Sequence, residues 1–270
     1  MRGWWQDLSD LVLPALCAGC GRSRTSLCAR CSAALCGAVP GRVRPRVEPP
    51  GLPVVHAAAP YQDAVRAVLL AHKERGALGL AGPLGAALAG AVRRGLADPA
   101  GWAGQAGQGP PGAAGIALVP VPSAPRAVRA RGHDPMRRIA LCAAAELRRA
   151  GVPARVLSVL RQRRPVADQA GLDARERLAN VAGALEAAAG AGELLREVGR
   201  IVVVDDLMTT GASLAEAARA VRALTPPDSG NAEVEDGPER VVPRFRMTRP
   251  NEVLGAVIAT SPDSFEINRK

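Results

Sequence analysis

The stretch that decides the fold runs from Ile201 to Leu214 and reads Ile-Val-Val-Val-Asp-Asp-Leu-Met-Thr-Thr-Gly-Ala-Ser-Leu. Its first four residues are apolar and β-branched, which favours a buried strand of a parallel sheet. From Leu214 to Leu224, apolar residues recur at helical spacing. The sequence therefore predicts a strand, a short polar turn and a helix, as in an α/β protein.

The polar turn between this strand and helix has the composition of a phosphate site. Gly211 permits close approach of the backbone, and Thr209, Thr210 and Ser213 add hydroxyl donors. At such a turn the backbone N–H groups and the positive end of the helix dipole point toward the ligand. We therefore expect a phosphate group to bind here.

Two carboxylates, Asp205 and Asp206, immediately precede the turn. Such a pair can accept hydrogen bonds from sugar hydroxyls or hold a cation near the same phosphate, so a phosphorylated sugar is the expected ligand. A Walker-type phosphate loop is excluded, because its lysine follows the second glycine and the only lysines are Lys73 and Lys270. The alternative is an ordinary strand–helix turn with surface acids.

The composition has room for one substantial α/β domain and a small appendage, since the chain has 270 residues of which 48% are hydrophobic. The net charge is +10 and only 2% of residues are aromatic. Basicity permits nucleic acid as a partner, but anionic phosphate substrates or a genomic bias toward arginine explain it equally well. The shortage of aromatics argues against a surface that stacks single-stranded bases.

Membrane insertion is not expected from this sequence. No run of 18 apolar residues free of charge occurs, and the apolar run at 11–17 is short and preceded by Asp7 and Asp10. We therefore predict a cytoplasmic protein.

Four cysteines near the N-terminus form two C-x-x-C pairs, Cys17 with Cys20 and Cys28 with Cys31. Two such pairs supply the four sulfur ligands of a tetrahedral structural zinc site. A redox dithiol or incidental cysteines are the alternatives, and Cys36 could replace one ligand. Cys142, on an expected helix, is interpreted as a small core residue.

The rest of the chain alternates expected strands and helices. A cysteine-rich zinc module is expected at 1–37, a linker at 38–53 and the α/β domain at 54–270, with flexible loops at 98–115 and 225–252. Further strands are expected at 54–59, 116–122, 154–160 and 253–259, and helices at 63–72, 80–96 and 136–147.

Residues 202–214 resemble the 5-phosphoribosyl pyrophosphate (PRPP) motif of type I phosphoribosyltransferases. Taken with three further landmarks in the same order, the chain resembles the ComF (ComF/GntX-like) family over nearly its whole length. The other landmarks are the N-terminal cysteine module, Val119-Pro-Val-Pro122 with its arginine-rich continuation, and Gln169-x-Gly-Leu-x-x-x-x-Arg177-x-x-Asn180.

This resemblance implies a type I phosphoribosyltransferase-like parallel sheet flanked by helices, and a role for each landmark. Asp205 and Asp206 would be catalytic and bind the ribose of PRPP with Mg²⁺. The 5′-phosphate would be held by Thr209, Thr210, Gly211, Ala212 and Ser213. Pyrophosphate would be approached by Ser123, Ala124 and Arg126, and by a mobile loop with Arg161, Arg163, Arg164, Arg175 and Arg177.

The function implied is transfer of the 5-phosphoribosyl group, a glycosyl transfer, from PRPP to an acceptor that the sequence does not identify. Arginines and Mg²⁺ would stabilise the charge on the departing pyrophosphate, and loop closure would exclude water. The alternative is a non-enzymatic factor for competence and DNA uptake. It would bind single-stranded DNA or partner proteins of the competence machinery, with the PRPP site as a sensor or relic.

Overall fold

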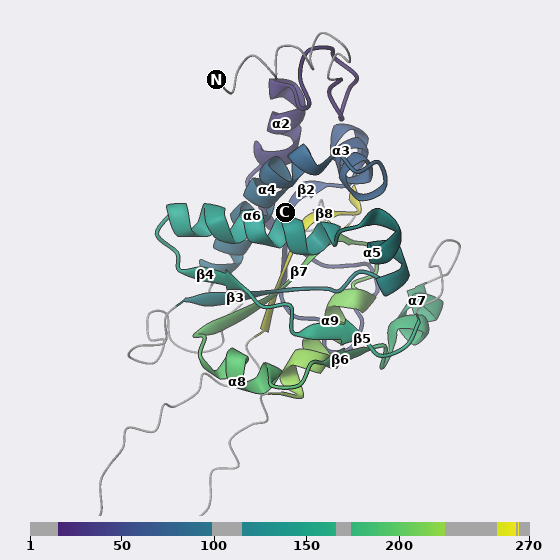
Figure 1. Ribbon diagram of the computed structural model, residues 1–270, viewed down its shortest axis with the longest axis vertical. Helices are drawn as coiled ribbons and strands as arrows, with labels where there is room; N and C mark the ends of the chain where they lie inside the picture. The colour runs from purple at the N-terminus through teal and green to yellow at the C-terminus, as the bar shows by residue number, and fades with distance from the viewer. Residues whose placement is uncertain (1–15, 99–114, 166–173, 225–252, 263, 265–270) are drawn as a thin grey trace, which may run out of the picture.

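The structure is a computed structural model and describes residues 16–98, 115–165, 174–224, 253–262 and 264 (Figure 1). It is a mixed α/β protein built on a mostly parallel sheet with helices on both faces. Among these residues, no helix is both long and apolar enough to cross a bilayer.

The main sheet has six strands in the order β1-β2-β8-β7-β3-β4. All neighbours pair in parallel except β1 and β2, which are antiparallel. The bounds are β1 Gly41–Val43, β2 Val55–Pro60, β3 Ile116–Pro120, β4 Ala154–Val156, β7 Arg200–Met208 and β8 Val253–Thr260. A separate antiparallel pair consists of β5 Leu160–Gln162 and β6 Leu185–Ala187.

The helices complete the layers around this sheet. Their bounds are α2 Ala29–Cys36, α3 Asp63–Glu74, the 3-10 turn η1 Leu78–Leu80, α4 Ala81–Leu96, α5 Pro125–Arg131, α6 Pro135–Arg149, α7 Ala174–Val181, α8 Ala191–Arg196 and α9 Ala212–Arg222. The helices α4 and α6 share one hydrophobic core with one face of the sheet. The other face packs against α8, α9 and the β5–β6 pair.

The core positions follow from the alternation of side chains along the central strands. Leu118 and Val202 face α4 and α6, whereas Val119 and Val203, one residue further along each strand, face α9. Both faces of the central strands are therefore buried, which is why they read as continuous apolar runs.

Strand β7 is longer than the sequence indicated. The apolar run ends at Val204, but the strand continues to Met208 because β8 stays paired with it up to Thr260. Asp205 and Asp206 consequently lie within the strand, and the turn begins only after Met208.

The prediction of a single strand at 154–160 is wrong. The segment divides into β4, at the edge of the main sheet, and β5, which begins at Leu160 and pairs with β6. The expected strands at 54–59, 116–122 and 253–259 are confirmed, as are the helices at 63–72, 80–96 and 136–147. The segment 38–53, expected as a linker, contains the edge strand β1. The expected loops at 98–115 and 225–252 lie outside the described residues apart from Asp98 and Gly115.

Helices α4 and α6 pack closely against each other, and Gly85 makes this approach possible. A Cβ at Gly85 would lie 2.4 Å from Cβ of Cys142 on α6, too close for any side chain. Cys142 is partly buried at this crossing, as a small residue facing a glycine.

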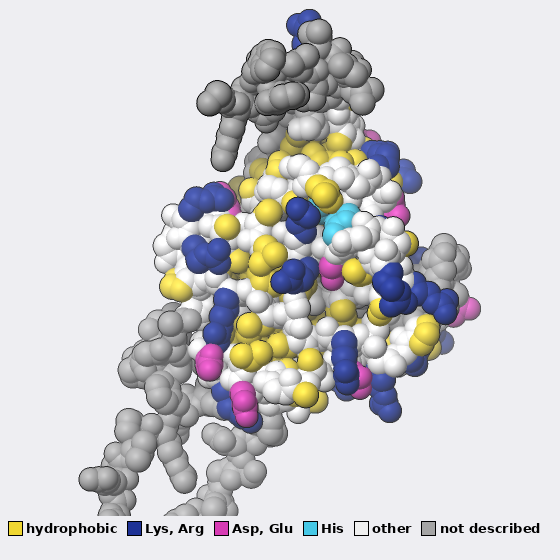
Figure 2. Space-filling view, in the orientation of Figure 1, with side chains coloured by type: hydrophobic (Ala, Val, Ile, Leu, Met, Phe, Trp, Pro, Cys, Tyr) yellow, Lys and Arg dark blue, Asp and Glu magenta, His cyan; other side chains and the backbone are white. Residues whose placement is uncertain are grey.

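Basic side chains are scattered over the face shown in Figure 2, between apolar and acidic ones. They do not gather there into a single stripe. On this face, therefore, the positive charge is spread out and not concentrated in one patch.

Candidate functional site

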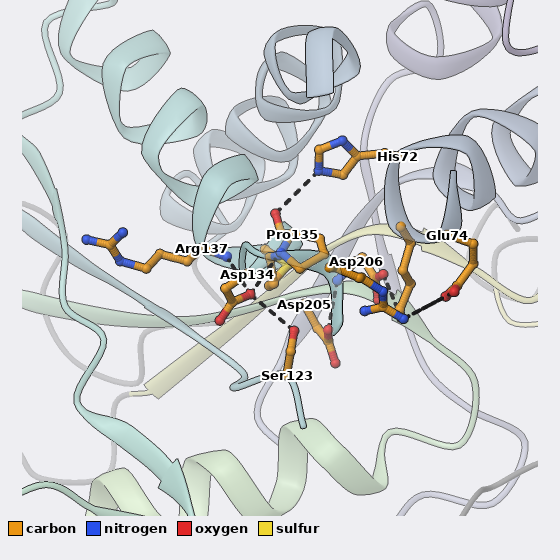
Figure 3. A network of polar contacts seen from close by, with 11 residues as sticks. His72, Glu74, Ser123, Asp134, Pro135, Arg137, Asp205 and Asp206 are labelled. Atoms are coloured by element: carbon orange, nitrogen blue, oxygen red, sulfur yellow. Dashed lines mark hydrogen bonds and ion pairs between the residues drawn. The ribbon is translucent and has the colours of Figure 1, made fainter. Parts of the chain in front are cut away.

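The acidic pair lies on β7, close to the end of the strand. The backbone N–H of Asp206 donates a 2.8 Å hydrogen bond to Oδ1 of Asp205. Both side chains are partly buried, and they lie beside the residues of Figure 3 that come from the turn after β3, from the end of α3 and from the start of α6. Two adjacent carboxyls are therefore held where several elements meet.

Lys73, near the end of α3, is the cation of this site. Its Nζ donates to Oδ2 of Asp206 at 2.9 Å. The charge of Asp206, followed by that of Asp205, raises the pKa of Lys73, although burial opposes this. Sequence reasoning missed this residue because it considered lysine only as part of a Walker motif. The available signal was its rarity, as one of two lysines among 35 basic residues.

The environment favours the protonated form of Asp205. Burial raises its pKa to about 8, and the charge of Asp206 adds to the effect, while Lys73 and the N–H of Asp206 act in the opposite direction. A carboxyl held protonated by burial and a like charge can bind a cation after it loses its proton.

The turn after β7 leads into α9, as the sequence indicated. Gly211 precedes α9 with φ of +76°, a left-handed conformation that glycine adopts without strain. A Cβ at this position would lie 3.0 Å from Cδ1 of Leu52. Thr209 is exposed, while Thr210 and Ser213 are half-buried. The first turn of α9 has no acidic residue and no side-chain cap, so its N–H groups suit an anion.

The turn after β3 lies next to the acidic strand. The N–H of Val121 donates to the carbonyl of Val204, one residue before Asp205. Ser123 Oγ donates at 3.1 Å to Asp134 Oδ1, and Asp134 also caps α6 through the N–H groups of Met136 and Arg137. Figure 3 shows Ser123 between Asp134 and Asp205. Ala124 and Arg126, at the start of α5, are exposed.

The five arginines expected on a mobile loop are not brought to the acidic pair by any hydrogen bond or ion pair that the described residues make. Arg161 pairs with Glu186 across the β5–β6 sheet at 2.9 Å, and Arg164 donates to the carbonyl of Ala182. Arg163 is exposed beside β5, and α7 contains Arg175 and Arg177. Gln169 and the residues around it, 166–173, lie outside the described part of the chain.

The β5–β6 pair is attached to α9 by a buried carboxylate. Glu216 accepts a hydrogen bond from the N–H of Leu185 at 3.1 Å and pairs with Arg219, whose Nη2 donates to the carbonyl of Leu185. Arg219 and the N–H of Leu185 hold the pKa of Glu216 below its ordinary value even though burial opposes this. The β5–β6 pair, which includes Arg161, is therefore fixed to the helix that follows the turn at 209–211.

The four N-terminal cysteines come together as the spacing predicts. The sulfur atoms of Cys17, Cys20, Cys28 and Cys31 all lie within 4.8 Å of one another, and none forms a disulfide. The Sγ atoms of Cys20 and Cys28 are 3.7 Å apart. A tetrahedral zinc site with bonds of about 2.3 Å has sulfur–sulfur edges of about 3.8 Å, so a structural metal such as zinc fits this cluster.

Local hydrogen bonds prepare one cysteine for a metal. Burial disfavours the thiolate of Cys17, but N–H groups including that of Cys28, 3.3 Å from its sulfur, outweigh this and lower its pKa to about 6. Burial raises the pKa of Cys31 to about 12. Cys36 lies apart from the cluster, since its Sγ donates to the carbonyl of Pro83 on α4. It does not replace a ligand in this structure.

No family model matches this chain, and no curated protein matches it. The fold and the cysteine cluster define a mixed α/β protein with a Cys₄ site suited to a structural metal.

Proposed function

We propose that this chain is a ComF-like protein with a type I phosphoribosyltransferase fold, which binds PRPP with Mg²⁺ and transfers its 5-phosphoribosyl group to an acceptor. The observation that supports this best is the order of groups on β7 and α9. An acidic pair lies near the end of the strand, and a turn with Gly211 at φ of +76° then opens a helix whose first N–H groups have no side-chain cap.

Each part of the site has a task that its chemistry suits. Asp205 and Asp206 accept hydrogen bonds from the ribose hydroxyls, and the turn from Thr209 to Ser213 binds the 5′-phosphate through hydroxyl and N–H donors. The two carboxylates offer the hard oxygen ligands that Mg²⁺ prefers. When bound, the ion neutralises charge on the pyrophosphate.

The pyrophosphate is assigned to the turn after β3. This turn lies beside β7 through the bond between Val121 and Val204, and its Ser123 is fixed by Asp134. Arg126 is exposed at the start of α5, where it can approach an anion. The zinc module would serve as a structural unit next to α3, because a closed four-sulfur site has no open position for catalysis.

Calorimetric titration with PRPP and Mg²⁺ tests the binding step. We expect the double variant Asp205→Asn/Asp206→Asn to lose at least about tenfold in affinity, since each carboxylate contributes charge-assisted bonds. The control is Glu193→Gln, which alters an exposed acid on α8 and should bind as the wild type does. No heat from the wild type at millimolar PRPP would overturn the proposal.

A second measurement separates turnover from sensing. Pyrophosphate release across a panel of bases and amines should identify the acceptor. If PRPP binds but no acceptor releases pyrophosphate, the protein senses the ligand instead of consuming it. A salt-dependent shift of fluorescent single-stranded DNA would instead support the DNA-uptake alternative.

A further inference from the structure

Helix α3 ends at the point where the two halves of the proposed site meet. Three consecutive residues at its end contact three different elements, and Figure 3 labels two of them, His72 and Glu74. His72 faces the carbonyl of Pro135 at the start of α6, Lys73 contacts Asp206 on β7, and Glu74 pairs with Arg131 at the end of α5. The end of α3 is therefore fixed between the acidic strand and the segment that follows β3.

The ammonium of Lys73 has capacity beyond its bond to Asp206. A lysine ammonium has three donors, and the bond to Oδ2 of Asp206 uses one of them. The side chain is 44% exposed, so a ligand at the acidic pair can reach it. Within the described part of the chain, Lys73 is the one cation that forms an ion pair with Asp205 or Asp206.

The surroundings of Lys73 indicate which phosphate it would meet. The 5′-phosphate is assigned to the turn at the start of α9, whereas Lys73 comes from α3. The neighbour of Lys73, Glu74, binds α5 through Arg131, and α5 directly follows the turn assigned to pyrophosphate. Lys73 thus approaches the acidic pair from the pyrophosphate side.

We propose that Lys73 binds an oxygen of the pyrophosphate group of PRPP while it holds the Asp206 carboxylate in place for the ribose. The inference rests on the proposed function, since it assigns a further ligand-contacting residue to the same site. A lysine acts here as a point charge for phosphate oxygens, whereas its bond to Asp206 fixes the direction of the carboxylate.

The raised pKa of Lys73 agrees with this role, because the two aspartates keep the ammonium charged. A ligand with a phosphate charge next to the ammonium would keep it charged as well. Lysine is therefore protonated before and after binding.

The test uses two fragments of the ligand in place of PRPP alone. Inorganic pyrophosphate with Mg²⁺ and ribose 5-phosphate with Mg²⁺ are titrated into wild type, Lys73→Met, Lys73→Arg and the control Arg66→Met. Arg66 is an exposed cation on the same helix, so its variant removes the same charge away from the site. Thermal unfolding of each variant shows that it is folded.

We expect Lys73→Met to weaken pyrophosphate and PRPP binding at least about tenfold and ribose 5-phosphate binding much less, since one charge-assisted bond is lost. Lys73→Arg should restore part of the pyrophosphate affinity, and Arg66→Met should match the wild type. An equal loss for both fragments would mean that Lys73 only orients Asp206, and this would overturn the inference.

The two proposals fail in different ways. If wild type binds PRPP and pyrophosphate and Lys73→Met binds both equally well, the role of Lys73 is wrong while the proposed function stands. If wild type binds neither, the proposed function is wrong and the role of Lys73 falls with it.

Discussion

Asp206 donates its backbone N–H to the side chain of Asp205, its neighbour on β7, at 2.8 Å. This bond favours ionised Asp205, but burial and the charge of the Asp206 carboxylate outweigh it and raise the pKa of Asp205 to about 8. Asp206 therefore favours the ionised form of Asp205 through its backbone N–H and disfavours it through its side-chain carboxylate.

Divalent cation binding at this pair should depend on pH. The cation competes with a proton on Asp205, so Mg²⁺ affinity should rise between pH 6 and pH 8 and level off above. Calorimetric titration of Mg²⁺ at several pH values measures this. In Asp206→Asn the like charge is gone, so the rise should shift to lower pH. An affinity that does not change with pH in the wild type would contradict the prediction.

The stability of the free protein should depend on pH in the opposite direction. The pKa of Asp205 lies above its ordinary value of 3.8. The contribution of protonated Asp205 to the free energy of unfolding is therefore fully present below pH 3.8 and is lost as the pH rises through about 8. The melting temperature of wild type should therefore fall between pH 6 and pH 9 more than that of Asp205→Asn. Equal falls in both proteins would show that another group is responsible.

Replacing Cys17 and Cys28 by serine should remove the bound metal and destabilise the N-terminal module. Elemental analysis should show one zinc per wild-type chain and far less in the variant, and the melting temperature should fall by about 5 °C or more. Cys36→Ser is the matched control, since Cys36 lies against Pro83 outside the cluster. Full metal content in the double variant would refute the zinc assignment.

The same cysteine variant should loosen α3. Ala64, in the first turn of that helix, packs against the cysteine cluster, and Lys73 in its last turn contacts Asp206. Hydrogen exchange of residues 63–74 should become faster without the metal. Unchanged protection there would mean that α3 is held by the main core alone.

Gly85→Ala should destabilise the contact of α4 with α6. The new methyl group would clash with Cβ of Cys142 and with the backbone of Ala143, which cannot move away as a flexible side chain can. We expect a loss of about 1–3 kcal/mol in the free energy of unfolding, measured with denaturant. Gly82→Ala, on the same helix with open space around it, should be neutral or gain about 0.5 kcal/mol.

Arg219→Met should weaken the attachment of the β5–β6 pair to α9. It removes the cation from the buried Glu216 and one bond to Leu185, so the free energy of unfolding should fall by about 1–3 kcal/mol. Hydrogen exchange at 160–162 and 185–187 should rise more than in the main sheet. Arg196→Met, an exposed change on α8, is the control and should leave exchange in both strands as it is.

Several features could be predicted from the sequence because their causes are local. A run of β-branched residues followed by a polar turn and a helical repeat is enough for β7 and α9, since each depends on neighbours within a few residues. The cysteine cluster is equally local, because seven residues separate its two pairs. Gly211 could be assigned to a turn from its residue type alone.

Other features depended on distant pairing. The strand β7 reaches Met208 because β8 lies beside it, and nothing in the run Asp205 to Met208 itself favours a strand. The three residues of β1 form a strand because β2 pairs with them. The segment at 154–160 divides because β5 has β6 as a partner, which a periodicity of two cannot reveal.

By itself, then, the sequence determined the central strand and helix, the carboxylates and hydroxyls at their junction, and the grouping of the four cysteines. Only the tertiary structure decided that Lys73 meets Asp206, 133 residues away along the chain. Local propensity acts over one or two turns of chain, whereas the position of α3 beside the end of β7 results from burying apolar residues of both in a common core.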